Sequence, residues 1–317
     1  MKQLVRWMGL ALLVAGMSNA LAQTARPLRL VVPFGTGGAP DVLSRLLAQR
    51  LGETVGWQVI VENKPGAGGV VAADFVMKSP ADATTIFIAD SGHFAIAPAL
   101  IAKLPFDPLR DFVPVSHIAS MPLVFAANAA FPAANLTELI ALAKARPLNY
   151  GSSGNGSPHH LGMELLKLIA KIDMVHIPYK GVAQSVPAML AGDVAVVLAG
   201  VPSVQPHVRA GKAKMLAVST GTRSTLLPDV PSAAESAPGF DLNVNVGMLA
   251  PAGTPREAVM RLHDEVAKIL REPEMVKRLA GLGIVAIGDS PEQFGALIRA
   301  EQDKYAKLVK ASGAKID

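Results

Sequence analysis

Short apolar runs alternate with segments of helical periodicity over most of the chain, and this alternation most constrains the fold. The run Leu28–Pro33 is followed by Asp41–Val55, where apolar residues recur at helical spacing, and then by a second apolar run at Trp57–Glu62. A strand, a helix and a strand in this order form a βαβ unit. Further strands are predicted at Thr84–Ala89, Leu123–Ala127, Met174–Ile177, Val194–Ala199 and Met215–Val218, and further helices at Leu136–Ala145, Leu161–Ala170, Ser185–Ala191 and Val204–Ala210. Such alternation favours parallel sheets covered by helices.

Two segments predict that the chain passes twice between two domains. Met121–Asn128 has the pattern of a strand that leaves the first sheet, and Val244–Ala250 that of a strand that returns. The remaining pattern is mainly helical, at Arg256–Leu270, Glu274–Leu282 and Pro291–Ala311, and we expect these helices to pack on the first domain. We therefore predict an α/β fold with domain 1 at residues 23–124 and 246–317 and domain 2 at residues 125–245.

The first 22 residues have the composition of a secretory signal peptide. Lys2 and Arg6 precede a short apolar segment, and Ala20-Leu21-Ala22 matches an A-x-A cleavage site. We therefore expect export to the periplasm and exclude residues 1–22 from the fold. The chain has no cysteine, so neither a lipid anchor on a terminal cysteine nor a disulfide is available.

Hydropathy and charge exclude two classes of partner from the prediction. After cleavage no uninterrupted apolar run approaches the ~18 residues that a membrane span needs, so we expect no direct membrane insertion. Removing Lys2 and Arg6 leaves 28 basic residues (30 minus 2) against 25 acidic ones, a net charge of about +3. The basic residues are dispersed and are not interleaved with aromatic residues, so we expect no nucleic-acid binding.

The segment Pro33–Asp41 is a glycine-rich turn between a predicted strand and a predicted helix. Free backbone N–H groups and the positive end of the helix dipole favour an anion at such a position. Ligands of open α/β sheets also lie beyond the carboxyl ends of the strands. The structural alternative is a tight turn that needs glycine at positive φ. The spacing matches neither a P-loop nor G-x-G-x-x-G, so nucleotide binding is not favoured.

A second glycine-rich turn, Tyr150–His160, has the same position between a strand and a helix. Ser157 is predicted to cap the helix, with Pro158 in its first turn. Ser152 and Ser153 add hydroxyl donors, so a cleft between the two turns could hold both ends of a dicarboxylate. A flexible polar loop is the alternative interpretation.

Two catalytic interpretations of this second turn remain open. Ser152 or Ser153 could be a nucleophile with His160 as its base, although the sequence does not match the G-x-S-x-G elbow. His160 and Glu164 could place two metal ligands on one helix face, but no third ligand lies near them in the sequence. We predict no catalytic residue, no metal and no cofactor.

Three other turns follow predicted strands. Asn63–Gly69 is interpreted as a structural turn, because only backbone groups and Lys64 could act there. Ser91-Gly92-His93 and Ile177–Gly181 are expected to face the same cleft, and the second offers the Tyr179 phenol and the Lys180 ammonium.

Taken in order, these segments resemble the Bug family, the substrate-binding proteins of tripartite tricarboxylate transporters, from Leu28 to Ala314. The resemblance rests on Leu30–Phe34 followed by Gly37-Gly38 and Asp41, Val61–Gly69, Leu104–Pro114, Leu148–Gly156 with His160, His176–Gly181, Pro202–Pro206, Leu227–Glu235 and Leu249–Pro255. It implies a two-domain, type II-like periplasmic-binding fold. It also implies a carboxylate ligand in the interdomain cleft, held largely by backbone amides and ordered water.

The family pattern, carried over by position, implies a set of ligand-binding residues. These are Phe34, Gly37, Gly38, Ser91, Gly92, Ser152, Ser153, Gly154, His160, Tyr179 and Gly200. The sequence departs from the pattern at Ala199, where an aspartate often stands, and this weakens the case for an amino-acid ligand. Thr36 replaces a common proline, and Asn245 and Val246 replace residues that are often aromatic.

The sequence therefore predicts a periplasmic solute-binding protein, not an enzyme, that captures a small carboxylate for a tripartite tricarboxylate-type transporter. One alternative is a binding protein that reports its ligand to a sensor protein instead of to the membrane subunits of a transporter. The other is a periplasmic serine-dependent hydrolase. We expect a monomer, because this fold works as a single chain.

Overall fold

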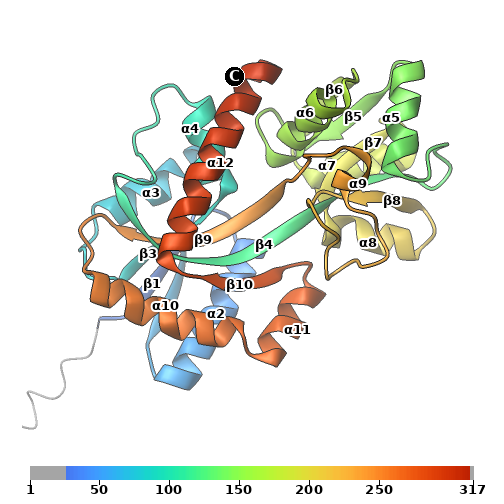
Figure 1. Ribbon diagram of the computed structural model, residues 1–317. Helices are drawn as coiled ribbons and strands as arrows, with labels where there is room; N and C mark the ends of the chain where they lie inside the picture. Colours follow the sequence, from blue (N-terminus) through green and yellow to red (C-terminus); the bar gives the residue numbers. More distant parts are fainter. Residues whose placement is uncertain (1–25, 315–317) are drawn as a thin grey trace, which may run out of the picture.

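Two strands, β4 (Phe112–Asn128) and β9 (Asn243–Pro251), run through both halves of the protein and hold them together (Figure 1). The computed structural model describes residues 26–314, so the predicted signal peptide lies outside the described residues. We call the two halves the first lobe and the second lobe.

The predicted strands and helices all occur in the predicted order, and the structure adds β10 and several short helices. The first lobe contains β1 (Leu28–Val32), α2 (Ala39–Val55), β2 (Val59–Asn63), η1 (Ala67–Gly69), α3 (Val70–Met77), β3 (Thr85–Asp90), η2 (Gly92–Ile96), α4 (Ala97–Leu100), α10 (Arg256–Leu270), α11 (Pro273–Gly281), β10 (Val285–Asp289) and α12 (Pro291–Ser312). The second lobe contains α5 (Leu136–Ala145), β5 (Asn149–Ser152), α6 (Pro158–Ala170), β6 (Val175–Pro178), α7 (Val182–Ala191), β7 (Val196–Gly200), α8 (Val201–Arg209), β8 (Ala213–Val218) and α9 (Ala233–Ser236).

The strands form one continuous path, β2-β1-β3-β9-β4-β7-β5-β6, with β10 and β8 also paired to β4. Pairing is parallel within β1–β3 and within β5–β7, as the alternation predicts. It is antiparallel wherever β4 or β9 takes part. The predicted parallel sheets are thus joined by an antiparallel centre, because the strand that crosses to the second lobe and the strand that returns run in opposite directions.

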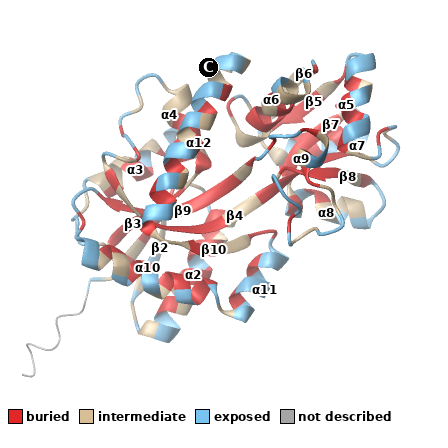
Figure 2. Ribbon diagram, viewed as in Figure 1, coloured by how far each residue is buried: buried red, intermediate tan, exposed pale blue. Residues whose placement is uncertain are grey.

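Three groups of apolar side chains form the core. One lies between the first-lobe sheet and α2, α10 and α11, and another lies between the second-lobe sheet and α7 and α8. The third begins under α3 and α12 in the first lobe and continues under α5 and α6 in the second. Figure 2 shows the resulting buried stretch along β4 and β9. Thus α12 packs on the first domain, as expected, and also contributes to the core beneath α6.

Local signals account for most helix ends. Ser157 accepts a hydrogen bond from the His160 N–H, so α6 begins at Pro158, which confirms the predicted cap. Ser290 and Gln293 form a capping box at the start of α12. β10 was not expected, because its short sequence between two helices has little apolar periodicity, and its pairing with β4 makes it a strand.

Candidate functional site

The carboxyl ends of the strands in the two lobes point toward each other. β3 runs antiparallel to β9, which runs antiparallel to β4, so β3 has the direction of β4 and ends toward the second lobe. β7 is antiparallel to β4 and ends toward the first lobe. Asp90 pairs with Val246 of β9, which in turn pairs with Ala119 of β4, and Gly200 pairs with Leu123 of β4. The ends of β3 and β7 are therefore four β4 residues apart, about 13 Å.

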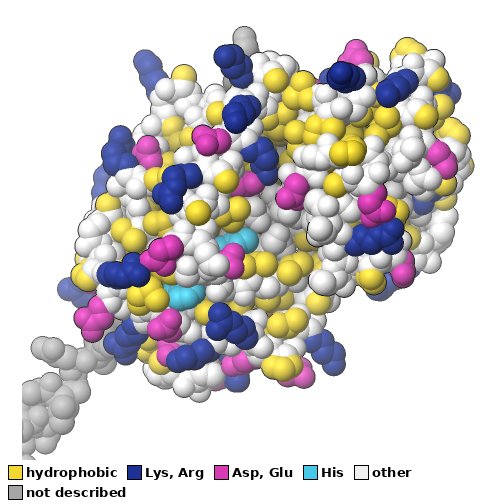
Figure 3. All heavy atoms as spheres, viewed as in Figure 1, with side chains coloured by type: hydrophobic (Ala, Val, Ile, Leu, Met, Phe, Trp, Pro, Cys, Tyr) yellow, Lys and Arg dark blue, Asp and Glu magenta, His cyan; other side chains and the backbone are white. Residues whose placement is uncertain are grey.

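The loops at these ends form two clusters. The first-lobe loop cluster comprises residues 34–41, 63–69 and 91–93, and the second-lobe loop cluster comprises residues 152–160, 176–181 and 200. Figure 3 shows the drawn face hollowed between the two lobes, with Lys and Arg side chains scattered over both.

Direct contacts join the three loops of the first-lobe cluster. The Asn63 Nδ2 atom donates to the Phe34 carbonyl at 3.0 Å and to the Asp41 Oδ1 atom at 2.8 Å. The Phe34 ring meets the His93 ring edge-on, with centroids 5.1 Å apart. A Cβ on Gly69 would lie 2.0 Å from the His93 ring, so the third glycine-rich turn needs glycine there to let the histidine approach. This supports its interpretation as a structural turn.

Gly37, just before α2, and Asp41, in the first turn of α2, form a closed polar unit. Gly37 has a φ of +87°, and its N–H donates to the Asp41 carboxylate at 2.9 Å. Burial alone would raise the pKa of Asp41, but hydrogen bonds from Arg45, the Gly37 amide and Asn63 lower it below its ordinary value. Asp41 is therefore ionised, and Arg45 balances its charge, which would otherwise repel an anion at this helix end.

The neighbouring backbone of this loop retains a free donor. Gly38 precedes α2 without a side-chain cap, and its N–H has no hydrogen-bond partner among residues 26–314. Gly38 is exposed, and a Cβ there would meet nothing closer than 3.9 Å. The first turn can therefore present this amide to an anion, whereas the Gly37 amide is already engaged.

Ser91 and Gly92 are both engaged within the protein, Ser91 through its hydroxyl and Gly92 through its backbone N–H. The Ser91 hydroxyl is fully buried, accepts the Asn245 N–H at 3.0 Å and lies 3.5 Å from a Glu301 carboxylate oxygen. It thus holds β3 to β9. The Gly92 N–H donates to Asp90, and a Cβ on Gly92 would lie 2.9 Å from that carboxylate. Asp90 also contacts His93 Nδ1 at 2.6 Å.

In the second-lobe cluster, two serines make close contacts with two histidines. The Ser152 Oγ atom lies 2.6 Å from His176 Nε2 and accepts the Gly154 N–H at 3.0 Å. The Ser153 Oγ atom lies 2.7 Å from His159 Nδ1, while the Ser153 N–H has no partner among the described residues. The expected pairing of either serine with His160 is not found.

His160 and His176 stack on each other and on Tyr150. Their ring centroids are 4.0 Å apart at an interplanar angle of 8°, and the Tyr150 ring lies 4.9 Å from that of His176. The Tyr150 hydroxyl donates to Glu164 at 2.6 Å. Burial, aided by His160, lowers the pKa of His176 to about 4, and burial also lowers the pKa of His160. Both rings are therefore neutral at pH 7.

The neutral state fixes the tautomer of His160. Its Nδ1 atom accepts the Gly156 N–H at 3.1 Å, so the ring proton is on Nε2, which has no hydrogen-bond partner among residues 26–314. Burial likewise lowers the pKa of His159 to about 4, although the residue as a whole keeps part of its surface exposed. These histidines thus supply neutral donors and no formal positive charge.

The remaining predicted residues complete the second-lobe cluster. The Tyr179 N–H donates to the Ser152 carbonyl at 3.1 Å, which fixes the two loops together. Gly154 has a φ of +124°, and a Cβ there would lie 3.5 Å from the Tyr179 carbonyl. Gly200 ends β7 and directly precedes α8. Lys180 is exposed and makes no ion pair within residues 26–314.

The structure does not assemble the two catalytic alternatives. No group of three potential metal-ligating side chains occurs among the described residues, and Glu164 instead accepts hydrogen bonds from Tyr150 and Lys167. The serine–histidine contacts lack an acid that orients the far nitrogen of either imidazole, within the part of the chain that is described. A triad of the hydrolase type is therefore not formed.

The sequence prediction named His93 at the cleft but did not single out His176 or His159, although both lie in segments that it placed at the strand ends. His176 could have been found from strand alternation and register, because it pairs with Tyr150, two residues before Ser152 and on the same face of β5. No sequence signal points to the contact between His159 and Ser153.

The described helices include none that is long and apolar enough to cross a bilayer.

Residues 43–314 match the model of the tripartite tricarboxylate transporter family receptors. Rpa4515 of R. palustris, solved with adipate, is 34% identical, with a TM-score of 0.80 over 92% of this chain and 99% of that one.

Two further solved structures are similar over most of their length. The periplasmic binding protein BugD is 30% identical, with a TM-score of 0.75 over 92% of this chain and 98% of that chain. MatC of Rhodopseudomonas palustris, solved with bound malate, is 30% identical, with a TM-score of 0.74 over 90% and 99% of the two chains.

Proposed function

This chain belongs to the tripartite tricarboxylate transporter family receptors, and from that premise we propose that it captures a small organic carboxylate between its two loop clusters. The carboxylate is then presented, chemically unaltered, to the membrane subunits of a transporter of the same family.

The observation that supports the proposal is the presence of unpartnered, uncharged donors in the loops at the facing strand ends of both lobes. The Gly38 amide of the first-lobe cluster and the Ser153 amide of the second-lobe cluster have no partner within residues 26–314. His160 adds an Nε2–H donor. Backbone amides and neutral imidazoles bind a carboxylate by charge-assisted hydrogen bonds without requiring a salt bridge.

The energy required is modest for such a site. A micromolar ligand needs about −8 kcal/mol. Hydrogen bonds to a charged group contribute about 1.5–3 kcal/mol each. Three to five of them, made in a gap from which lobe closure excludes water, are sufficient. Closure is then a population shift, driven by contacts that only the closed form makes.

Two solved relatives indicate the chemical class of the ligand. Rpa4515 was solved with adipate and MatC with malate, both dicarboxylates. The ends of β3 and β7, which carry loops of the two clusters, are about 13 Å apart along β4, which is compatible with a ligand that has a carboxylate at each end. No acidic residue precedes Gly200 here, since Ala199 occupies that position, so the site favours dicarboxylates over amino acids.

Periplasmic location is part of the proposal. The predicted signal peptide at residues 1–22 supports export, and the similar protein BugD is a periplasmic binding protein. Cell fractionation with mass determination of the mature chain tests this directly. A product that begins at Gln23 in the periplasmic fraction is expected, and an uncleaved cytoplasmic product would contradict it.

The decisive experiment is a thermal-shift screen of residues 23–317 against mono-, di- and tricarboxylates, amino acids and phosphate esters, followed by calorimetry. Stabilisation that grows with ligand concentration is required of any ligand that binds the native state. We expect adipate or malate, or a dicarboxylate of similar length, to produce it. Recovery of the ligand unchanged after long incubation separates a receptor from a hydrolase.

A negative screen has a definite meaning. If no carboxylate stabilises the protein, or if a stabilising compound is consumed, the receptor proposal fails. If a carboxylate binds but its uptake is unchanged in cells that lack the protein, the binding half stands and the transporter half fails.

A further inference from the structure

A cavity of about 590 Å³ lies at the opposite end of the first lobe from the loop clusters. Leu28 at the start of β1 lines it, whereas Phe34 of the first-lobe cluster follows the end of the same strand. Six residues of extended chain separate the two places by about 20 Å. The volume falls within the ~300–1,000 Å³ that is typical of small-molecule sites.

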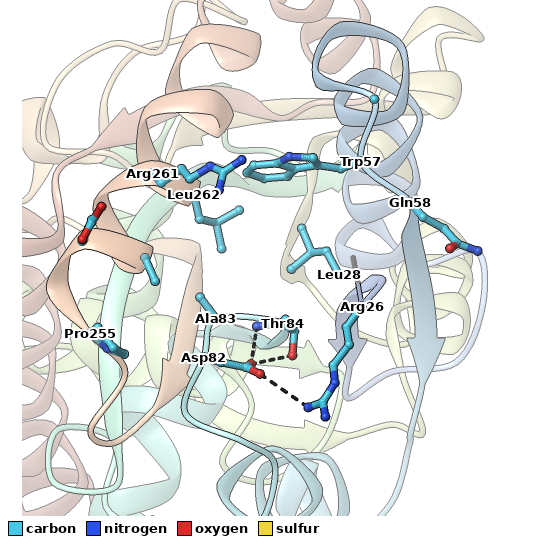
Figure 4. Close-up of a pocket in the computed structure, with 13 residues that line it drawn as sticks. Arg26, Leu28, Trp57, Gln58, Asp82, Ala83, Thr84, Pro255, Arg261 and Leu262 are labelled. Carbon is cyan, nitrogen blue, oxygen red and sulfur yellow. Dashed lines mark hydrogen bonds and ion pairs between the residues drawn. The ribbon is translucent and has the colours of Figure 1, made fainter. Parts of the chain in front are cut away.

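One face of α10 forms a wall of this cavity. Ala258, Arg261 and Leu262 are spaced three and four residues apart, so they lie on the same side of the helix. The opposite wall comes from Leu28 and from Trp57, just beyond the end of α2. Figure 4 shows Leu28 and Leu262 directed into the cavity, with Trp57 and Arg261 together along one side.

One side of the cavity carries an ion pair, whereas the other side carries a cation without an acidic partner among the described residues. On one side, Arg26 lies 3.7 Å from Asp82, and Asp82 also accepts the Thr84 N–H at 3.0 Å. On the other side, the Arg261 guanidinium carbon lies 5.4 Å above the Trp57 ring. Arg261 makes no ion pair among residues 26–314, so its charge is held in place by the indole without an anionic partner.

Apolar side chains and an unmatched guanidinium in one cavity define the chemistry of its ligand. We propose that this cavity is a second binding site, independent of the gap between the lobes, for a small carboxylate with an apolar body. The apolar body packs on Trp57, Pro255 and Ala258, which keep accessible surface in the cavity, and the carboxylate accepts the paired N–H groups of Arg261. Glu257, exposed on the rim one turn before Arg261, opposes the same anion.

The sequence provides a reporter for this site. The chain has two tryptophans, Trp7 and Trp57, and Trp7 lies in the predicted signal peptide. In the protein 23–317, Trp57 is therefore the sole tryptophan, and its fluorescence reports the cavity and not the loop clusters.

The test is a titration of residues 23–317 with benzoate, followed by Trp57 emission and by ligand-observed NMR. Benzyl alcohol is the uncharged control of similar size, and hexanoate distinguishes an aromatic from an aliphatic apolar body. We expect saturable binding of benzoate and not of benzyl alcohol. Arg261→Gln is expected to weaken benzoate binding roughly tenfold or more, because a charge-assisted pair is lost. Glu257→Gln is expected to strengthen it.

A variant in the first-lobe cluster keeps the two sites apart. Gly37→Val is expected to leave the benzoate titration unchanged while it removes stabilisation by the dicarboxylate found in the thermal-shift screen. The inference is overturned if neither fluorescence nor NMR detects benzoate. It is also overturned if Arg261→Gln, folded by circular dichroism, binds benzoate as tightly as the parent, or if Gly37→Val abolishes the signal.

Discussion

Gly37 and Gly192 have the same backbone geometry at different places in the protein. Both have a φ of +87°, both are exposed, and a Cβ at either would meet no atom within 4 Å. Gly37 lies in the first-lobe loop cluster, whereas Gly192 ends α7. The two glycines therefore allow the cost of backbone strain to be separated from an effect on ligand binding.

We predict that Gly37→Val and Gly192→Val each lower the free energy of unfolding by about 1–2 kcal/mol, the cost of an L-residue in the left-handed region. Only Gly37→Val should also abolish carboxylate binding, because relief of the strain moves the loop that presents the Gly38 amide. Urea unfolding and calorimetry of both variants check this. Equal affinity in the two variants would remove residues 34–41 from the site.

Two of the predicted binding residues, Ser91 and Ser152, use their side chains to hold the site together. The hydroxyls of Ser91 and Ser152 are both fully buried and engaged within the protein. Their proposed contribution to binding is therefore to position the backbone of their loops. Sequence reasoning assigned Ser152 a hydroxyl that donates to the ligand, because the sequence does not reveal that His176 lies 2.6 Å away.

At the scale of elements, the histidine stack joins β5, β6 and α6 through Tyr150, His176 and His160. Glu164 and Lys167 of α6 are the charged groups that face it, and they pair with each other at 2.9 Å. Because the pair is nearly neutral overall, burial is the main cause of the lowered histidine pKa values. The stack therefore couples proton binding to the stability of the second lobe.

The buried histidines of the second lobe lead to a prediction of how the stability of the protein depends on pH. A histidine in an unfolded chain has a pKa near 6.5, whereas the pKa values of His176 and His159 in the folded protein are about 4. Between these values the unfolded chain binds more protons. Stability should therefore be complete above about pH 6.5 and fall toward pH 4, by at most about 1.4 kcal/mol per pH unit for each histidine.

Urea unfolding between pH 5 and 7 measures this dependence. His176→Phe preserves an aromatic ring between Tyr150 and His160 but cannot bind a proton, so its stability should change less with pH than that of the parent. An identical pH profile in the variant would show that the stack does not contribute to the effect.

Secondary structure could be predicted well wherever the signal is local. The helices Leu136–Ala145 and Arg256–Leu270 have the bounds that periodicity predicts. The first half of β4 could not be predicted, because Pro114, Ser116 and His117 interrupt its apolar pattern. Pairing with β9 on one side and β10 on the other makes this segment a strand.

At the scale of the whole molecule, the predicted two-domain periplasmic-binding fold and the resemblance to the Bug family are confirmed. The domain limits at residues 124/125 and 245/246 stay a prediction. Their support is that β4 changes partners near Leu123, from β9 and β10 to β7 and β8. Such a place, where two strands alone connect the lobes, is where a hinge is expected.

Beside this place, the two lobes approach each other closely at Gly283 and Pro202. Gly283 of the first lobe has a φ of +72°, and a Cβ there would lie 2.8 Å from the Pro202 ring of the second lobe. We predict that Gly283→Ala weakens carboxylate binding, because the lobes must shift to admit the methyl group and the loop clusters then no longer face each other correctly.

Gly253→Ala is the matched control, with a φ of +82° and no atom within 4 Å of the added methyl. Calorimetry gives the affinities, and small-angle scattering gives the radius of gyration with and without ligand. If both variants bind as the parent does, the contact between Gly283 and Pro202 has no part in lobe arrangement.

The sequence by itself determined the order of strands and helices, the positions of the glycine-rich turns after the strands, and the two crossings between lobes. These properties depend on residues that are near one another in the chain, through apolar periodicity, capping and the conformational freedom of glycine. Only the tertiary structure decided that Ser152 contacts His176, that the Gly37 amide is taken by Asp41, and that Arg261 stands unmatched over Trp57. Those contacts depend on strand register and lobe packing, which bring together residues that are distant in the chain or unpredictably oriented.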